Sequence, residues 1–176
     1  MILRLIKYRF ERNNFLLALV FLAPGITNAQ DEVTTIDGVV TALYQSISGA
    51  SSEPRDWQRF QNLFAPYAQI NSLVPMDQGV VEFRQGSVSE YIENSTPFFE
   101  ARDFYEYEIG RKTDEYYGLA QVFSSYEYRF EKEGEVMRRG INSMQLAFFE
   151  GRWWIISLTY NAESPHIPIP DIYLSK

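Results

Sequence analysis

Gly151-Arg-Trp-Trp-Ile-Ile-Ser-Leu-Thr-Tyr160 is the stretch of sequence that decides the fold. Eight of its ten residues are apolar, aromatic, β-branched or hydroxylated, a composition typical of a β-strand. It follows Glu150-Gly151, a dipeptide that favours a tight hairpin turn. Working back from this turn, we expect residues 105–160 to form four consecutive antiparallel strands.

The turns also predict the register, because directly opposed residues share one face of a sheet. A two-residue loop at Glu150-Gly151 pairs Phe148 with Trp153. Polar stretches at 131–135 and 112–115 are the turns expected for the two earlier strand pairs.

This register predicts one face that is largely apolar and carries no acidic residue, so that it should meet the helices. Its members are Tyr105, Tyr107, Ile109, Ala120, Val122, Ser124, Tyr126, Tyr128, Asn142, Met144, Leu146, Phe148, Trp153, Ile155, Ser157 and Thr159. The other face is mixed: it carries Glu106 and Glu108 together with several aromatic residues.

The N-terminus has the pattern of an export signal. Arg4, Lys7, Arg9 and Arg12 precede an apolar run at 15–26, and Thr27-Asn28-Ala29 offers small residues at a cleavage site. The run is shorter than the roughly 20 residues that span a bilayer, so we expect a cleaved signal peptide over residues 1–29. A retained anchor is the alternative. Cleavage places the mature protein in the periplasm or outside the cell, with no stable membrane span.

Charge and cysteine content exclude some functions. The chain has 176 residues, enough for one domain with a single core, and a net charge of −7. Removing residues 1–29 takes away four basic side chains and one acidic one, which leaves a net charge of −10. Such an acidic domain repels phosphate backbones, which argues against nucleic-acid binding. The sequence has no cysteine, so no disulfide or thiolate chemistry is available.

Helical patterns come before the predicted sheet. Apolar residues recur at spacings of three and four from Thr35 to Ile47, and a second apolar stripe follows Glu53-Pro54. Residues 67–74 favour a short strand, and Ser87 with Glu90 has the capping-box pattern at the start of a third helix that runs to about residue 99. The domain should therefore cover residues 30–163, followed by a proline-rich tail, 164–176, docked on it.

Three segments resemble the NTF2-like superfamily, whose members include ketosteroid isomerase and the SnoaL-like cyclases. They are Asp56-Trp57-x-x-Phe60-x-x-Leu63-Phe64-Ala65-Pro66, Arg139-Gly140-Ile-Asn-Ser143-x-x-Leu146 and Gly151-Arg152-Trp153-x-Ile155. The resemblance covers roughly residues 35–163. It implies an α+β cone in which about three N-terminal helices pack on a strongly curved, mainly antiparallel sheet and leave a pocket between.

Catalytic members of this superfamily place carboxylates or histidines inside the cone. On our register the position where many SnoaL-like relatives have a histidine is Thr159, and the inward face holds no Asp, Glu or His. Asp77 is the loop carboxylate that we weigh as catalytic, against an ordinary loop residue as the favoured interpretation. His166, the only histidine, lies in the tail without metal-ligand partners at suitable spacing, so we expect neither a metal nor a cofactor.

A ligand pocket is one interpretation of the polar but uncharged inner face; a closed core with internally bonded hydroxyls is the other. The residues expected to line it are Tyr105, Tyr107, Ser124, Tyr126, Tyr128, Arg138, Asn142, Met144, Ser157 and Thr159, with Tyr44 and Trp57 from the helices. Arg138 could bind a ligand's carboxylate or extend to water.

The other face predicts a homodimer, because exposed aromatic patches usually mark interfaces. The residues expected at this interface are Phe123, Arg139, Gln145, Trp154, Ile156 and Tyr160. The tail is the alternative cover for this face.

We expect a protein that binds a small, largely apolar ligand without catalysis. The alternatives are an isomerase, cyclase or hydrolase that uses a loop carboxylate, and a dimeric interaction module with a filled cone. A cavity without a carboxylate would support binding, and an inward carboxylate with a raised pKa would support an enzyme.

Overall fold

The computed structural model describes residues 32–76 and 81–175, and the expected α+β class is confirmed. The elements are α1 (Ile36–Ile47), α2 (Trp57–Asn62), β1 (Phe64–Pro75), β2 (Val81–Ser87), α3 (Val88–Ala101), β3 (Tyr105–Tyr116), β4 (Leu119–Arg129), β5 (Arg138–Phe149), β6 (Arg152–Ala162) and the short 3₁₀ helix η2 (Asp171–Tyr173). The expected signal peptide, residues 1–29, lies outside the described residues. No helix in the described part of the chain is long and apolar enough to cross a membrane.

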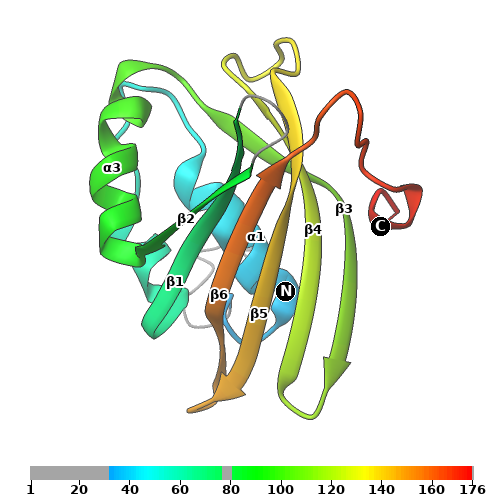
Figure 1. The fold of residues 1–176 in the computed structure, drawn as a ribbon. Helices are drawn as coiled ribbons and strands as arrows, with labels where there is room; N and C mark the ends of the chain where they lie inside the picture. Colours follow the sequence, from blue (N-terminus) through cyan, green and yellow to red (C-terminus); the bar gives the residue numbers. More distant parts are fainter. Residues whose placement is uncertain (1–31, 77–80, 176) are drawn as a thin grey trace, which may run out of the picture.

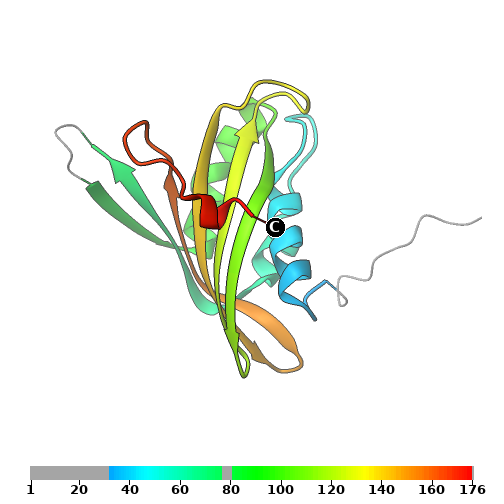
Figure 2. The ribbon, with the colours of Figure 1, turned by 90° about the vertical axis from the view of Figure 1, so that its right-hand side faces the viewer.

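One six-stranded sheet, in the order β2-β1-β6-β5-β4-β3, organises the molecule. The sheet is mixed, because β1 and β6 run parallel while every other neighbouring pair is antiparallel. The expected strong curvature is not found: the sheet is twisted but open, with β2 and β3 at its two edges. Helix α1 lies behind the sheet in Figure 1 and beside one face of it in Figure 2.

Local sequence explains where the helices begin. Thr35 is the N-cap of α1, where its hydroxyl accepts from the backbone N–H of Gly38 at 3.0 Å. Asp56 caps α2, which therefore starts later than the Glu53-Pro54 signal suggested. The capping box of α3 is confirmed, with Ser87 and Glu90 satisfying each other's backbone N–H groups.

The core lies between these helices and the inner face of the sheet. Val40, Leu43, Val122, Met144 and Ile155 are at most 3% exposed. Each fully buried side chain of this size contributes about 1.5–3 kcal/mol relative to exposure, so this layer supplies much of the driving force for folding.

The predicted register of β3 is wrong. Tyr116 pairs with Leu119, so the turn is Tyr117-Gly118 and not the polar stretch at 112–115, which continues as edge strand. Both turn residues have positive φ (43° and 81°), as a tight two-residue hairpin turn requires. A bulge between Glu108 and Gly110 shifts the pairing again.

This bulge exchanges the faces of the first half of β3. Glu106 pairs with Tyr128 and Glu108 with Tyr126, which places both carboxylates on the inner face. Tyr105 and Tyr107 lie on the outer face, against our expectation. The inner face is therefore not free of acidic residues, contrary to the prediction.

The register of β4 on β5 matches the prediction, and so does the pairing of Phe148 with Trp153. Beyond Ile155 a bulge in β6 changes the alternation, so that Met144 opposes Leu158 and Asn142 opposes Tyr160. Leu158 and Tyr160 therefore lie inside, while Ser157 and Thr159, which we expected inside, lie outside.

The C-terminal segment returns across the outer face of β3 and β4 (Figure 2). The Tyr173 ring stacks on Phe123 with centroids 5.2 Å apart, and its carbonyl oxygen accepts from the Ser125 hydroxyl at 2.8 Å. A side chain at Gly110 would meet the Tyr173 carbonyl oxygen at 2.5 Å, so glycine permits this close approach.

Candidate functional site

A pocket of about 270 Å³ lies between the inner face of the sheet and helices α1, α2 and α3. Its lining includes eight aromatic side chains, four aliphatic ones and four with other polar groups. They are Leu43, Ile47, Phe60, Ile70, Tyr91, Asn94, Ser95, Phe98, Phe99, Phe104, Glu106, Tyr126, Tyr128, Asn142, Leu158 and Tyr160. One end of the pocket is formed by Asn94, Ser95 and the 39%-exposed Phe98 of α3.

Among the described residues that line this pocket, Glu106 is the one charged side chain. Its side chain is half-buried and keeps part of its surface open to the pocket. Burial raises the pKa of the Glu106 carboxyl to about 8, although a hydrogen bond from Asn142 acts in the opposite direction. Within residues 32–76 and 81–175, no lysine or arginine forms an ion pair with Glu106.

A chain of hydrogen bonds holds Asn142 in place. Its amide Nδ2 donates to Glu106 Oε1 at 3.4 Å and to the Tyr44 hydroxyl at 3.1 Å. The Tyr44 hydroxyl and Ser124 Oγ are 2.7 Å apart, and Ser124 Oγ donates to Glu108 Oε1 at 2.5 Å. Because the Ser124 proton is directed at a carboxylate, the Tyr44 hydroxyl is the donor to Ser124.

The chain continues to the surface through an arginine. Arg111 Nε lies 2.9 Å from Glu108 Oε1, and its Nη1 lies 2.7 Å from the exposed carboxylate of Asp37. Glu108 therefore has a cationic partner, whereas the described residues offer none to Glu106, which makes the two inward carboxylates chemically different.

Buried phenols supply the other polar groups of the site. Burial first, and the charge of Glu106 second, raise the pKa values of Tyr91 and Tyr126 above the ordinary range of tyrosine. Both side chains therefore stay protonated at neutral pH and can donate hydrogen bonds to a ligand.

The structure brings together only part of the predicted pocket lining. Tyr126, Tyr128 and Asn142 line the cavity, and Tyr44 and Ser124 lie directly behind Asn142 in the hydrogen-bonded chain. The other predicted residues lie elsewhere: Met144 in the closed core, Trp57 against the rings of Phe60 and Phe99, Arg138 exposed at the start of β5, and Tyr105, Tyr107, Ser157 and Thr159 on the outer face.

Sequence reasoning missed Glu106, Tyr91, Tyr160 and Phe104. The signal for Glu106 was Gly110: an isolated glycine inside a strand favours a bulge, and the bulge between Glu108 and Gly110 turns Glu106 inward. No comparable signal marks the bulge in β6, because Ile155-Ile156-Ser157 alternates as well in either register.

The residues predicted for a dimer interface have varied surroundings. The prediction for Tyr160 is wrong, because this residue lines the inner pocket. Phe123 stacks on Tyr173 of the tail, Trp154 stacks on Phe149, and Arg139 lies 3.6 Å from Glu163. Gln145 is exposed and Ile156 is 37% exposed.

The remaining candidates lie away from the pocket. Asp77 lies outside the described residues, and His166 is exposed in the tail. Among the described residues, no three His, Cys, Asp or Glu side chains are arranged to hold a metal ion.

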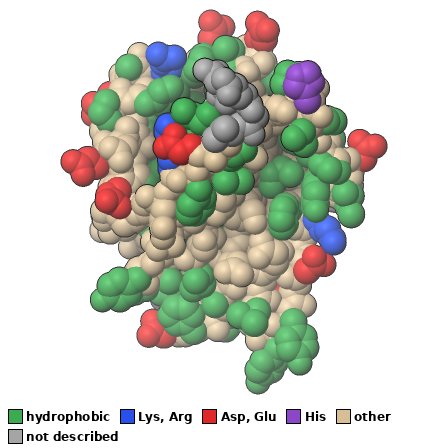
Figure 3. Space-filling view, viewed as in Figure 1, with side chains coloured by type: hydrophobic (Ala, Val, Ile, Leu, Met, Phe, Trp, Pro, Cys, Tyr) green, Lys and Arg blue, Asp and Glu red, His purple; other side chains and the backbone are tan. Residues whose placement is uncertain are grey.

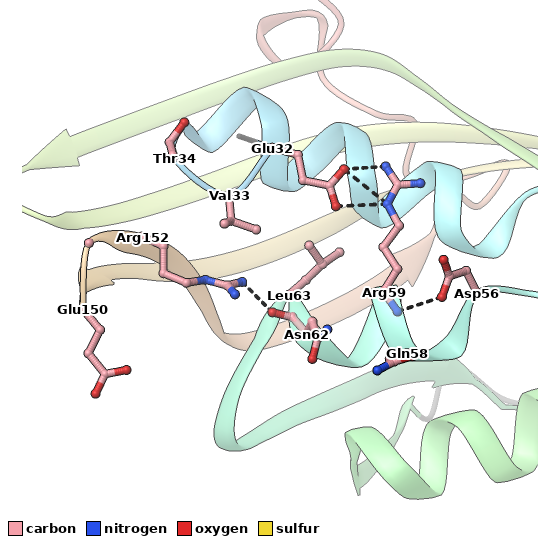
Figure 4. Close-up of a pocket in the computed structure, with 11 residues that line it drawn as sticks. Glu32, Val33, Thr34, Asp56, Gln58, Arg59, Asn62, Leu63, Glu150 and Arg152 are labelled. Atoms are coloured by element: carbon pink, nitrogen blue, oxygen red, sulfur yellow. Dashed lines mark hydrogen bonds and ion pairs between the residues drawn. The ribbon is translucent and has the colours of Figure 1, made fainter. Parts of the chain in front are cut away.

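A larger hollow of about 640 Å³ lies where α2 approaches the β5–β6 turn (Figure 4). The Arg59 side chain is held there by Glu32 at 2.7 Å, and Arg152 donates to the backbone oxygen of Asn62. The Arg152 guanidinium also lies 3.8 Å above the Trp154 ring. The lining of this hollow is mostly charged and polar, so the aromatic pocket is the better candidate site for a small ligand.

No family model matches this sequence, and no curated protein matches it. Several solved structures share its fold. A protein of unknown function with a cystatin-like fold from Nostoc punctiforme superposes with a TM-score of 0.55 at 12% identity, over 75% of this chain and 90% of that one. An NTF2-like protein of unknown function from Silicibacter pomeroyi superposes at 0.51 and 13% identity, over 77% and 99%.

A third structure, from Streptomyces avermitilis, is provisionally named a dehydratase of the NTF2-like family. It superposes with a TM-score of 0.54 at 11% identity, over 78% of this chain and 99% of that one. Likeness at this level of identity shows the NTF2-like fold and does not transfer an activity.

Proposed function

We propose that this protein binds a small, largely apolar ligand in the aromatic pocket. The observation that supports this most directly is the pocket itself: about 270 Å³ of space lined by eight aromatic rings, in the core layer where side chains would otherwise close-pack. The same cavity argues against the alternative of an interaction module with a filled cone.

Ligand capture tests the proposal. Purified protein is incubated with cell extract, and retained small molecules are identified by mass spectrometry. Ser95→Trp places an indole at the pocket lining and should abolish retention, whereas Ser89→Trp, at an exposed position of the same helix, should not. Equal retention by both variants would place the bound molecules outside this pocket.

Proton-transfer catalysis is the second candidate, and Glu106 is the observation that favours it. A carboxyl with a pKa of about 8 that is open to a cavity can act as a general acid or base near neutral pH. Tyr91 and Tyr126 could then stabilise a developing oxyanion by hydrogen bonding. The dehydratase name of the Streptomyces avermitilis structure fits this chemistry class.

The two candidates differ in what Glu106→Gln does. For a catalyst, the variant should bind ligand but lose turnover by a factor of about 10²–10⁴, the usual contribution of general acid–base catalysis. For a binding protein there is no turnover to lose. The expectation of a non-catalytic protein rested on an inner face without acids, and Glu106 removes that support.

We also propose export by cleavage after Ala29 and pairing of two chains through the outer sheet face. The short apolar run after a basic segment supports export. Exposed apolar side chains at the ends of the β3–β4 and β5–β6 hairpins support pairing.

A further inference from the structure

The pocket has a one-sided charge pattern. Among its lining residues Glu106 is the single acidic group, and lysine, arginine and histidine are all lacking. Asn142 donates to one oxygen of the Glu106 carboxyl, Oε1. For the other oxygen, Oε2, the described part of the chain supplies no hydrogen-bond donor, although the group lines open space.

Such a site discriminates between ligands by their charge. An anionic ligand would meet a carboxyl group with no cation to compensate, which is unfavourable in a medium of low dielectric constant. A neutral ligand leaves the carboxyl in its protonated form. A cation supplies the missing partner for the carboxylate, and the faces of the surrounding rings add cation–π attraction.

We propose that the natural ligand of the pocket is a hydrophobic amine, bound as its ammonium ion against Glu106. This inference rests on the proposed ligand-binding function and narrows it to one chemical class. The ammonium group lies at the carboxylate, within a wall of phenylalanine and tyrosine rings, and the apolar body of the ligand extends toward α3. In this arrangement Glu106 is a counter-ion, which distinguishes it from a general base.

Binding of a cation at Glu106 should release a proton that can be measured. Glu106 has a pKa of about 8, so most molecules carry a protonated carboxyl at pH 7, and the arrival of a cation releases that proton. The other titratable groups that face Glu106 are Tyr44 from α1, Tyr91 from α3, Tyr126 and Tyr128 from β4, Tyr160 from β6 and Glu108 from its own strand.

These neighbours do not supply a competing cation. Burial raises the pKa values of Tyr44, Tyr91 and Tyr126, so these phenols stay neutral over the range considered. Glu108 is held by Arg111 at 2.9 Å. Between pH 7 and pH 9 the ionised fraction of Glu106 rises from about one tenth to about nine tenths, so cation affinity should rise roughly tenfold.

Two isosteric probes test this inference. Benzyltrimethylammonium carries a positive charge that does not depend on pH, and neopentylbenzene has the same shape without the charge. Binding of both is measured by calorimetry at pH 7 and pH 9. At pH 9 we expect the cation to bind at least tenfold more tightly than neopentylbenzene. At pH 7 its binding should release close to one proton per protein molecule. From pH 7 to pH 9 the affinity for the cation should rise about tenfold, while the affinity for neopentylbenzene should not change.

Two variants distinguish the effect of the Glu106 carboxylate from the effect of the protein's net negative charge. Glu106→Gln should equalise the two probes at both pH values. Glu93→Gln, which removes an exposed carboxylate of α3 and so changes the net charge equally, should leave the preference intact. The pH dependence of the wild-type protein needs no variant, so a misfolded Glu106→Gln would not block the test.

The outcomes separate the inference from the function on which it rests. If both probes bind equally and without pH dependence, the amine inference is overturned and ligand binding stands. If the cation is preferred equally in Glu106→Gln, the site of the cation lies elsewhere and the inference fails. If neither probe enters the pocket, the proposed function itself is contradicted.

Discussion

Glu106 should govern how the stability of this domain depends on pH. Its pKa rises from 4.5 to about 8 on folding, so the folded protein holds a proton that the unfolded chain loses as pH increases. The stabilisation from this proton is full below pH 4.5 and is lost as pH rises through about 8. Ionisation in the folded state therefore costs on the order of 3–5 kcal/mol, by linkage across that interval.

Glu106→Gln should remove this dependence, because the amide cannot ionise. Chemical denaturation of both proteins at pH 4.5, 6 and 8 should show the wild type losing several kcal/mol against the variant. Glu93→Gln, at an exposed site, is the control that should track the wild type. Parallel curves for Glu106→Gln and the wild type would show that Glu106 is not desolvated.

Trp153→Ala should destabilise the domain by about 3–5 kcal/mol, the usual cost of emptying a buried aromatic site. Trp153 is 7% exposed, and its ring meets Phe148 edge to face at 5.4 Å. Trp154→Ala is the matched control and should cost less, since that ring lies on the outer face against Phe149. Urea denaturation of monomeric protein measures both, and the reverse order would mean that the two rings have exchanged faces.

For the helices and strands, the sequence predicts which elements exist and of which type better than it predicts how the strands pair. The capping box at Ser87, the 3.6-residue periodicity of α1 and the Glu150-Gly151 turn each depend on local chemistry, and each is found in the structure. The strand β2 was missed, because its seven residues are largely exposed and polar and lack an alternating apolar pattern.

Errors in strand register account for most of the wrongly placed residues of the candidate site, because each one-residue bulge exchanges the two faces of a strand. The bulge near Ile109 brought Glu106 inside, and the bulge after Ile155 brought Tyr160 inside and moved Thr159 out. Gly110 marks the bulge in β3, whereas the bulge in β6 has no local sequence signature. Tyr126, Tyr128 and Asn142 were placed correctly because β4 and β5 pair without a bulge.

The β3–β4 turn gives a prediction at this scale. Gly118 has φ of 81°, so Gly118→Ala should cost about 1–2 kcal/mol of stability through left-handed backbone strain. The added methyl group meets Phe148 at an ordinary 3.5 Å, so steric contact adds little. Thermal denaturation should show a lower midpoint for this variant.

Tyr117→Gly is the matched control for the turn. Tyr117 has φ of 43° and its side chain is 96% exposed, so glycine should relieve strain at little cost in packing. We expect unchanged or higher stability. A loss similar to that of Gly118→Ala would mean that the turn residues do not set the register.

For the whole molecule, cleavage after Ala29 should give a mature chain that starts at Gln30. Intact mass spectrometry of protein from a bacterial host with a functional export pathway should show the loss of residues 1–29. Replacing Ala29 with a bulky residue such as Phe should block processing. A full-length product in the membrane fraction of the wild type would instead identify a retained anchor.

The outer face of the sheet bears on assembly. Figure 3 shows its centre as polar and uncharged, with hydrophobic side chains gathered at its lower end. That end holds the β3–β4 and β5–β6 hairpin turns, whose exposed apolar residues on this side include Tyr116, Tyr117, Leu119 and Phe149. The tail crosses β3 and β4 near Phe123 and Ser125, so this apolar end and Ile156 stay exposed. Trp154 is half-buried against Phe149.

A symmetric dimer would bury this surface against its own copy, which is the commonest closed arrangement of soluble homo-oligomers. Its polar centre is compatible with such an interface, because non-obligate interfaces are about as polar as the rest of a protein surface. Sedimentation at micromolar concentration should give the mass of two chains. Trp154→Glu should reduce it to one chain with an unchanged circular dichroism spectrum, because it replaces an aromatic side chain of the interface with a charged one. Ser89→Glu on α3, at an exposed position away from the sheet face, should leave the dimer intact. If the wild type sediments as a single chain, this surface is not a dimer interface and the aromatic hairpin ends must serve another contact.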